Sequence, residues 1–188
     1  MIIIIDNYDS FTQNLVQYTG EINSKIQVVR NDEIHLNYLN KVNPSHIILS
    51  PGPGKPENSG ICLEIISKYA NQIPILGVCL GHQSIGYIYG ANIKKLKQPT
   101  HGKTSFIFHN TTNLFSQLPC PFIATRYHSL IIDQNNLPKN LEITAWTKDG
   151  TIMGCQHKIY KKLQGLQFHP ESLWTNHGKT IIKNFLLF

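Results

Sequence analysis

The feature that most constrains this chain is the pattern G-x-C-x-G, which runs from Gly77 to Gly81. It overlaps an apolar run at 75–78 that is typical of a buried strand, and it leads into a stretch with helical spacing of apolar residues. A strand that turns this tightly into a helix strains its central residue, and glycines two positions away leave room for the crossing. Cys79 would then lie at a helix N-terminus, where the dipole favours a thiolate, with the Leu80 N–H beside it as an oxyanion donor. The pattern alone leaves two interpretations open, a nucleophile elbow or a structural cysteine at an ordinary strand–helix junction.

Composition indicates a globular protein and gives little support for a charged partner. With 188 residues, 41% of them hydrophobic and 15% charged, the chain fits one domain with a sizeable core. The net charge of +6 raises nucleic acid as a partner. However, the grouped lysines form two short clusters without interleaved aromatic residues: Lys94, Lys95 and Lys97, then Lys158, Lys161 and Lys162. We therefore expect a solvated lysine surface and no nucleic-acid partner.

The cysteines and the apolar segments narrow the class of protein further. The four cysteines are too far apart for a C-x-x-C metal site, and no apolar run approaches membrane-spanning length. We expect free thiols in a reducing compartment, no metal and no membrane partner. The chain begins with an apolar strand, so we also expect no signal or transit peptide. Its bias toward Ile, Lys and Asn is what AT-rich coding would produce, which favours the plastid stroma over a bacterial cytoplasm.

Strand and helix patterns alternate in the first half of the chain, and short strands dominate the second half. The first half predicts strands at 2–5, 26–29, 46–49 and 75–78, and helices from Ser10, at 33–39, from Cys62 and from Gly81. The second half predicts strands at 93–96, 103–108, 122–127, 141–146, 152–157 and 163–168, a hairpin across Asp149-Gly150 and a closing helix. For the first helix, Ser10-x-x-Gln13 predicts a capping box, and Phe11, Leu15, Tyr18 and Ile22 predict an apolar stripe. The sequence therefore predicts a single-domain α/β fold over residues 1–188, with a mostly parallel central sheet, flanking helices and an added antiparallel part.

Four loops should meet at the edge of this sheet where the parallel strands end. Three of them are the loop at 6–10, the rigid turn at 50–54 and the turn at Cys79, and the fourth lies at 168–172. In the fourth, Pro170 holds His169 extended, and Glu171 lies two residues further on. The carboxylate would orient the imidazole, and the imidazole would take the proton from Cys79. A histidine before proline is more often an ordinary loop residue, but this grouping with a cysteine and a carboxylate favours catalysis.

Two non-catalytic alternatives remain. The first is a flavodoxin-like binding module that holds a phosphate at the loop 6–12. Asp6 and Asp9 argue against it, because two carboxylates repel a phosphate and no glycine opens the loop. The second is a catalytically silent regulatory homologue, which the intact set of Cys79, His169 and Glu171 disfavours.

Over essentially its whole length the chain resembles the class I (triad) glutamine amidotransferases. GVCLGHQ at 77–83 is similar to the nucleophile motif of that family, QFHPES at 167–172 to its His/Glu motif, and SPGPG at 50–54 to the loop that supplies a second oxyanion N–H. Within the family, DNYDSFTQNL from Asp6, HGKTS at 101–105, RYHSL at 126–130 and the closing GKTIIKNFL resemble the glutaminase subunits of anthranilate synthase and 4-amino-4-deoxychorismate synthase. Two departures, Thr100 before HGK and Leu173-Trp174 after HPES, lie outside the catalytic motifs.

The resemblance implies a role for each matching residue. Cys79 would be the nucleophile, His169 the general base and Glu171 its orienter. The substrate L-glutamine would be held by Gly52, Pro53, Gly54, Leu80, Gln83, Ser129 and Leu130, with the second oxyanion N–H coming from Gly52. No cofactor and no metal are implied.

The same resemblance implies a partner for the released ammonia. The chain shows no second catalytic domain and no P-loop, so the acceptor should bind to another polypeptide. The implied partner is the chorismate-binding large subunit, component I of anthranilate synthase, in a heterodimer or heterotetramer that makes anthranilate for tryptophan biosynthesis. A role in 4-amino-4-deoxychorismate synthase of folate biosynthesis, or in both enzymes, is the alternative.

Overall fold

The structure is a computed structural model that describes the backbone of residues 1–188 and all side chains except those of Lys97 and Gln98. The side chain of Lys97, in the first lysine cluster, therefore lies outside the described residues.

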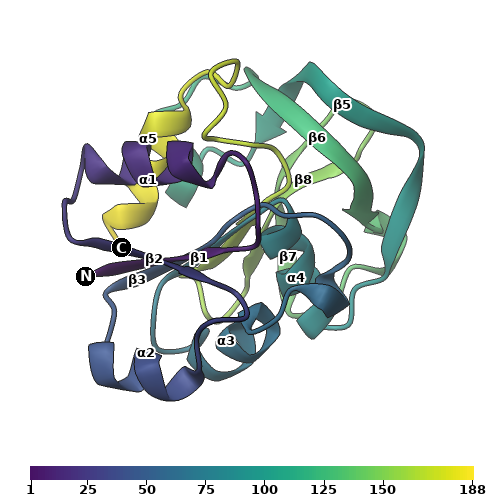
Figure 1. The fold of residues 1–188 in the computed structure, drawn as a ribbon. Helices are drawn as coiled ribbons and strands as arrows, with labels where there is room; N and C mark the ends of the chain where they lie inside the picture. Colours follow the sequence, from purple (N-terminus) through teal and green to yellow (C-terminus); the bar gives the residue numbers. More distant parts are fainter.

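The described strands form one nine-stranded sheet in the order β2-β1-β3-β4-β9-β8-β7-β5-β6 (Figure 1). Its parallel half contains β1 (Ile2–Asp6), β2 (Ile26–Arg30), β3 (His46–Leu49), β4 (Ile75–Val78) and β9 (Leu163–Leu166). Its antiparallel half contains β5 (Ile93–His109), β6 (Phe122–Ile132), β7 (Leu141–Trp146) and β8 (Ile152–His157). The predicted fold class is confirmed.

Helices cover both faces of the parallel half (Figure 1). One face carries α1 (Thr12–Gly20) and α5 (Gly178–Leu186), and the other carries α2 (Leu36–Val42), α3 (Cys62–Tyr69) and α4 (Leu80–Ile88). Three short 3-10 helices complete the described elements: η1 (Pro56–Asn58), η2 (Asn113–Phe115) and η3 (Gln134–Asn136). None of the helices in the described part of the chain is long and apolar enough to cross a membrane.

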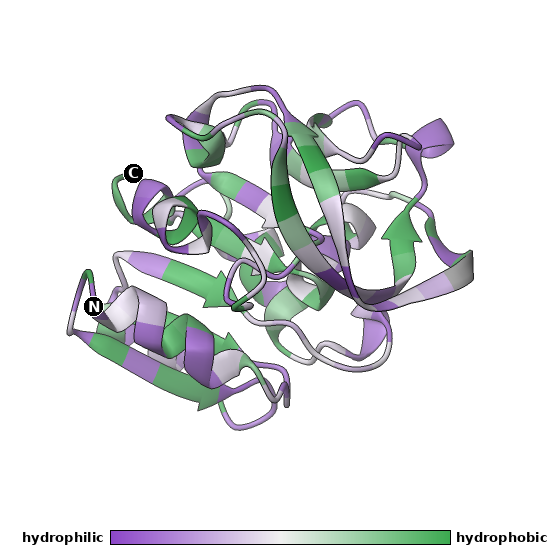
Figure 2. Ribbon diagram, turned by 90° about the horizontal axis from the view of Figure 1, so that it is seen from above, coloured by the Kyte–Doolittle hydropathy of each residue, from purple (hydrophilic) through white to green (hydrophobic). Residues whose placement is uncertain are grey.

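The sheet separates two hydrophobic clusters, because successive side chains of a strand point to opposite faces. On β1, Ile3 and Ile5 pack toward the cluster under α2, α3 and α4, whereas Ile2 and Ile4 pack toward the cluster under α1 and α5. All four isoleucines are fully buried, and each contributes about 1.5–3 kcal/mol by leaving water. A strand buried on both faces is uniformly apolar rather than alternating, and the four isoleucines of β1 have this pattern because all five residues of the strand are buried. Figure 2 shows how hydrophobic and hydrophilic residues are distributed over the elements of the fold.

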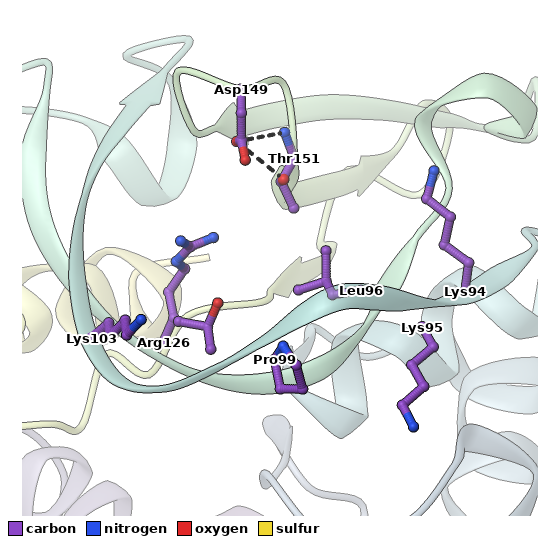
Figure 3. Close-up of a pocket in the computed structure, with 9 residues that line it drawn as sticks. Lys94, Lys95, Leu96, Pro99, Lys103, Arg126, Asp149 and Thr151 are labelled. Carbon is purple, nitrogen blue, oxygen red and sulfur yellow. Dashed lines mark hydrogen bonds between the residues drawn. The ribbon is translucent and has the colours of Figure 1, made fainter.

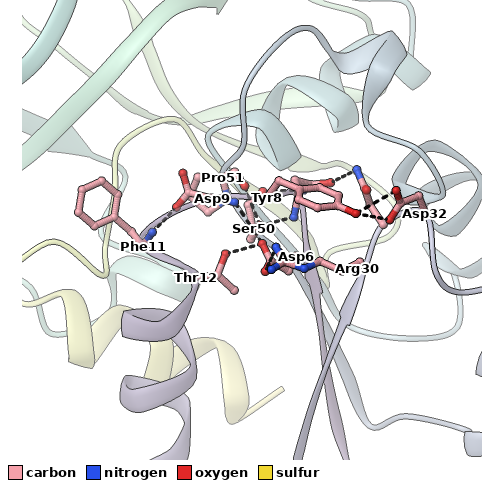
Figure 4. A network of polar contacts seen from close by, with 11 residues as sticks. Asp6, Tyr8, Asp9, Phe11, Thr12, Arg30, Asp32, Ser50 and Pro51 are labelled. Atoms are coloured by element: carbon pink, nitrogen blue, oxygen red, sulfur yellow. Dashed lines mark hydrogen bonds and ion pairs between the residues drawn. The ribbon is translucent and has the colours of Figure 1, made fainter.

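The capping box predicted at Ser10 is wrong. Helix α1 begins at Thr12, and no side chain caps it at its N-cap residue, Phe11. Carboxylates organise this turn instead: the Thr12 hydroxyl donates to Asp6 Oδ1 over 2.9 Å, and the Phe11 N–H donates to Asp9 Oδ2 over 2.7 Å (Figure 4). The end of β1 and the loop after it therefore set the start of the helix.

The same carboxylates argue against a phosphate-binding loop. The Arg30 guanidinium forms an ion pair with Asp6, Nη1 to Oδ2 at 2.6 Å, and lies 4.5 Å from the centre of the Tyr8 ring. The Tyr8 hydroxyl donates in turn to Asp32 (Figure 4). The Asp6 charge is thus paired within the protein, and a phosphate there would face the carboxylates of Asp6 and Asp9.

The predicted apolar stripe of the first helix is only partly correct. Leu15 is fully buried and Tyr18 packs at the edge of the core. Phe11 and Ile22 lie outside α1 and are 38% and 42% exposed. Phe11 belongs to the candidate site instead.

Two predicted strands are parts of one. The segments 93–96 and 103–108 both belong to β5, which pairs with β6 through two register shifts. Such irregularities break the alternation that marks a strand in a sequence, so the pattern appears interrupted where the backbone continues. The hairpin predicted across Asp149-Gly150 is confirmed, because β7 and β8 pair antiparallel around it.

Other boundaries shift by a few residues, which is where local patterns carry least information. The helix predicted at 33–39 is α2, from Leu36 to Val42, and the strand predicted at 122–127 continues to Ile132. The helix after Cys79 begins at Leu80 rather than Gly81. The strand predicted at 163–168 ends at Leu166, so His169 lies in the loop directly after it.

Candidate active site

Cys79 occupies a strained turn between β4 and α4. Its backbone angles are φ +51° and ψ −96°, in the positive-φ region that a residue with a side chain rarely adopts. A Cβ atom on Gly77 would lie 2.4 Å from the carbonyl of Gly81, and one on Gly81 would lie 2.7 Å from the Leu49 oxygen. The Cys79 N–H donates to the Leu166 oxygen over 2.7 Å, which ties the turn to β9. The geometry predicted from G-x-C-x-G is therefore present, and both glycines are needed for it.

His169 and Glu171 form a buried pair in the loop after β9. His169 Nδ1 and Glu171 Oε1 are 2.6 Å apart, and the two side chains are 3% and 0% exposed. Burial alone would lower the pKa of His169, but the Glu171 charge and the interaction with Cys79 hold it well above the ordinary histidine value. His169 Nε2 is buried and has no hydrogen-bond partner among the described residues. Because Nδ1 is engaged by Glu171, Nε2 is the ring nitrogen that remains free to exchange a proton with Cys79.

The backbone of His169 is anchored to β6. Its N–H donates to the Thr125 oxygen over 3.1 Å, and its carbonyl accepts from the Thr175 hydroxyl over 2.6 Å. Thr175 also accepts from the Thr125 N–H, and Ser172 donates to the Thr125 hydroxyl. These contacts fix the backbone that carries the imidazole. Sequence reasoning missed Thr125 and Thr175, because nothing local marks a contact between such distant segments.

Two aromatic rings flank the His169 imidazole. Tyr127 meets it edge-on with ring centres 5.2 Å apart, and Phe11 meets it edge-on at 6.3 Å. The two aromatic rings stack on each other at 5.6 Å. They restrict water around the imidazole and so strengthen its interaction with Glu171. Tyr127 lies within RYHSL, but neither ring was assigned a role from the sequence.

The turn at 50–54 packs against the start of α4. A Cβ atom on Gly52 would lie 3.0 Å from Leu80 Cδ2, and also 2.5 Å from Asn7 Cβ and 2.6 Å from the Asn7 oxygen. Asn7 holds the turn in place, because its N–H donates to Ser50 Oγ and its side-chain amide donates to the Ser50 carbonyl. The two residues predicted to supply oxyanion N–H groups, Gly52 and Leu80, are thereby brought into contact.

Gln83 and Leu130, both predicted to hold glutamine, are joined in a chain of amides. Gln83 Nε2 donates to the Leu130 carbonyl over 2.9 Å and to Gln167 Oε1 over 3.2 Å. Gln167 Nε2 lies 3.6 Å from Cys79 Sγ, as a donor to the sulfur. Gln167 lies in the QFHPES motif but was not among the predicted site residues. The other residues predicted to hold glutamine, Pro53, Gly54 and Ser129, are exposed.

Two other buried histidines and two buried cysteines lack the surroundings of the candidate site. Burial lowers the pKa of His82 to about 3 and that of His128 to about 4, so both are neutral at physiological pH. Burial raises the pKa of Cys62 and of Cys155 to about 12, which keeps both as thiols. Across the described residues, no group of three or more His, Cys, Asp or Glu side chains is arranged to hold a metal ion.

A cavity of about 670 Å³ lies elsewhere, lined by residues of β5 and β6 and of the turn between β7 and β8 (Figure 3). Its lining includes four basic residues and one acidic residue and consists of Lys94, Lys95, Leu96, Pro99, Thr100, Lys103, Arg126, Asp149 and Thr151. Two of these charges are engaged within the protein, because Lys94 pairs with Asp133 and Asp149 accepts from Thr151. The cavity contains none of the predicted catalytic or glutamine-holding residues, so the candidate site remains at the ends of the parallel strands.

Comparison with known proteins agrees with this geometry. The family model "Glutamine amidotransferase class-I" matches residues 3–187. The chain belongs to this family. The resemblance found in the sequence is thereby confirmed, and the protein is a glutamine-hydrolysing enzyme subunit.

Two curated relatives and one solved structure match over at least nine tenths of their lengths. The chain is 62% identical to anthranilate synthase component 2 of Porphyra purpurea, over 99% of this chain and 98% of the relative. It is 47% identical to the aminodeoxychorismate/anthranilate synthase component 2 of Bacillus subtilis, over 99% and 95%. Among solved structures, a protein from Thermoplasma acidophilum that is described as a GMP synthase subunit superposes with a TM-score of 0.86 at 28% identity, covering 98% of this chain and 91% of that one.

Proposed function

We propose that this chain is the glutaminase subunit of anthranilate synthase. In this proposal it hydrolyses L-glutamine through Cys79, His169 and Glu171 and passes ammonia to a chorismate-binding large subunit. One observation supports the catalytic part of the proposal. Cys79 lies in a strained elbow, and the buried His169–Glu171 pair, at 2.6 Å, leaves Nε2 of the imidazole free to exchange a proton with the sulfur.

The chemistry follows from these groups. The imidazole of His169, whose pKa is raised, takes the proton from Cys79 and so generates the thiolate. The thiolate attacks the side-chain carbonyl carbon of glutamine, and the developing oxyanion accepts hydrogen bonds from the Leu80 and Gly52 N–H groups. His169 then donates its proton to the departing nitrogen, ammonia leaves, and a thioester with Cys79 remains.

The second half-reaction returns the enzyme to its starting state. Water attacks the thioester while His169 takes one of its protons, and glutamate leaves as the sulfur regains its charge. Glu171 keeps the imidazole oriented and stabilises its positive charge in both halves. Exposed Pro53, Gly54 and Ser129, together with Gln83 and Leu130, would hold the glutamine.

The partner and the pathway rest on the relatives. The match to a component 2 from Porphyra purpurea supports an assembly with component I and the production of anthranilate. The Bacillus subtilis relative, named for both syntheses, keeps open a role in 4-amino-4-deoxychorismate synthesis or in both. Mixing the chain with each of the two large subunits in turn, while following the fluorescent product anthranilate, separates these possibilities. The biased composition supports the plastid stroma as the compartment, which cell fractionation tests against a bacterial cytoplasm.

The catalytic proposal is tested with Cys79→Ser in the reconstituted complex. Glutamine-dependent synthesis should be lost, while synthesis from added ammonium salts should continue because the large subunit carries the acceptor site. Cys120→Ser, which changes an exposed cysteine outside the site, is the matched control and should leave both activities intact. Appreciable glutaminase turnover by Cys79→Ser would show that the nucleophile is another group.

A further inference from the structure

We propose that Gln167 is the residue that stabilises the Cys79 thiolate, and that Gln83 acts through it as a positioning residue. The proposal rests on the assignment of Cys79 as the nucleophile and adds a function for two side-chain amides. It requires that the Gln167 amide donate to the sulfur and that a second contact hold the amide in that orientation.

The contact with the sulfur meets the first requirement. Gln167 Nε2 lies 3.6 Å from Cys79 Sγ, and the side chain of Gln167 is fully buried. A neutral thiol is a weak acceptor, whereas a thiolate accepts strongly. A donor fixed at this position therefore stabilises the charged form of the nucleophile more than the neutral form, which makes the thiol easier to ionise.

The contact with Gln83 meets the second requirement. An amide can rotate to present either its oxygen or its nitrogen to the sulfur. Gln83 Nε2 donates to Gln167 Oε1 over 3.2 Å, which fixes the oxygen of Gln167 away from Cys79 and turns the nitrogen toward it. Gln83 is itself fixed by its bond to the Leu130 carbonyl at 2.9 Å, and it is only 3% exposed. The donor–acceptor direction of this series of hydrogen bonds is thus set by the Leu130 carbonyl, which can only accept.

The backbone brings the amide and the sulfur together. The Cys79 N–H is bonded to Leu166, the residue before Gln167, and the Gln167 N–H donates to the Met153 oxygen over 2.9 Å. Two residues after Gln167 the chain reaches His169. The segment 166–171 therefore carries the thiolate donor, the base and its orienter on one short stretch beside Cys79.

The test is the pH dependence of Cys79 alkylation by iodoacetamide, measured without glutamine by peptide mapping. In Gln167→Leu the rate near neutral pH should fall about tenfold, which corresponds to one hydrogen bond to a charged group. At alkaline pH, where the thiol is ionised in both proteins, the two rates should converge. A role confined to packing would lower the rate at every pH. The exposed Cys120 is an internal reference whose rate should stay constant in each sample.

Three further variants keep the test decisive. Gln167→Glu keeps the size and the acceptor for Gln83 but replaces the donor by a charge, so its loss should be at least as large. Gln164→Leu, which removes a buried glutamine within β9, is the matched control and should react like the wild type. Gln83→Leu should lose less than Gln167→Leu, and the double variant should lose no more than Gln167→Leu alone, because the two residues act in series.

Two results would overturn the inference. One is an unchanged pH profile in Gln167→Leu and Gln167→Glu, provided that both melt like the wild type. The other is a Gln167→Leu variant whose glutaminase KM is raised while its kcat is unchanged, which would show that Gln167 contacts the substrate. Neither bears on the proposed function, whose failure would be seen separately as retained turnover in Cys79→Ser.

Discussion

Replacing Glu171 by glutamine removes one charge from the site while keeping the shape of the side chain. Glu171 is fully buried, its Oε1 lies 2.6 Å from His169 Nδ1, and its charge is the main interaction that raises the His169 pKa. Glutamine can still accept a hydrogen bond from the imidazole N–H through its amide oxygen. The substitution therefore isolates the electrostatic contribution of the carboxylate from its packing.

The expected loss is large because the pair is excluded from water. Removing one partner of a buried charge pair typically costs about 3–5 kcal/mol, so we expect a loss of stability near the lower end of that range, about 3 kcal/mol. For catalysis, loss of the orienting carboxylate in a triad lowers the rate by up to about 10⁴-fold, and we expect a fall of about 10²–10⁴-fold in kcat.

The pH dependence of the stability loss has a definite sign. The folded-state pKa of His169 is raised, so its pairing stabilises the protein fully below the pKa of an unfolded histidine, about 6.5. This stabilisation is lost as the pH rises through the higher folded pKa. The stability difference between wild type and Glu171→Gln should accordingly be larger at about pH 6 than at alkaline pH.

The assay combines glutamate release by the reconstituted complex with thermal unfolding across this pH range. Glu142→Gln is the matched control, because Glu142 forms a half-exposed ion pair with Lys161 and such pairs contribute about 0–1 kcal/mol. It should leave activity and the pH dependence unchanged. If Glu171→Gln behaved like Glu142→Gln in both measurements, the carboxylate would have no electrostatic role and the triad assignment would be refuted.

Three further outcomes are expected. His169→Ala should lower glutaminase kcat at least as much as Glu171→Gln, because the imidazole transfers the proton that the carboxylate only stabilises; steady-state rates at equal folded fraction give the order. Gly52→Ala should lower kcat by about 10²–10³-fold through displacement of an oxyanion donor, because its Cβ would lie 2.5 Å from Asn7 Cβ. Gly90→Ala, whose Cβ would meet no atom within 4 Å, is the control without a clash and should keep its kcat. An electrophilic glutamine analogue should modify Cys79 alone, since burial raises the pKa of both Cys62 and Cys155 to about 12 and the exposed Cys120 lies outside the glutamine site; label spread evenly over the cysteines, read by peptide mapping, would contradict this.

The sequence by itself determined the features that are encoded locally. Alternating strand and helix patterns predicted the α/β fold, because burial on one or both faces of an element shows in its own residues. The spacing from Gly77 to Gly81 predicted the elbow, since a turn this tight excludes side chains within the same short segment. His169 and Glu171 could also be predicted from the sequence, because parallel strands bring their carboxyl-end loops to one edge of the sheet and Pro170 favours an extended backbone.

Only the tertiary structure decided which distant side chains complete the site. Phe11 has the spacing of a buried helical residue, yet it lies beside the His169 imidazole because the Asp6 and Asp9 carboxylates start the helix at Thr12 instead of at Ser10. The donation from Gln167 to Cys79 depends on the pairing of β4 with β9, and a register shift of one residue would turn Gln167 to the opposite face. Register and packing are collective properties of the folded chain, so no local pattern records them.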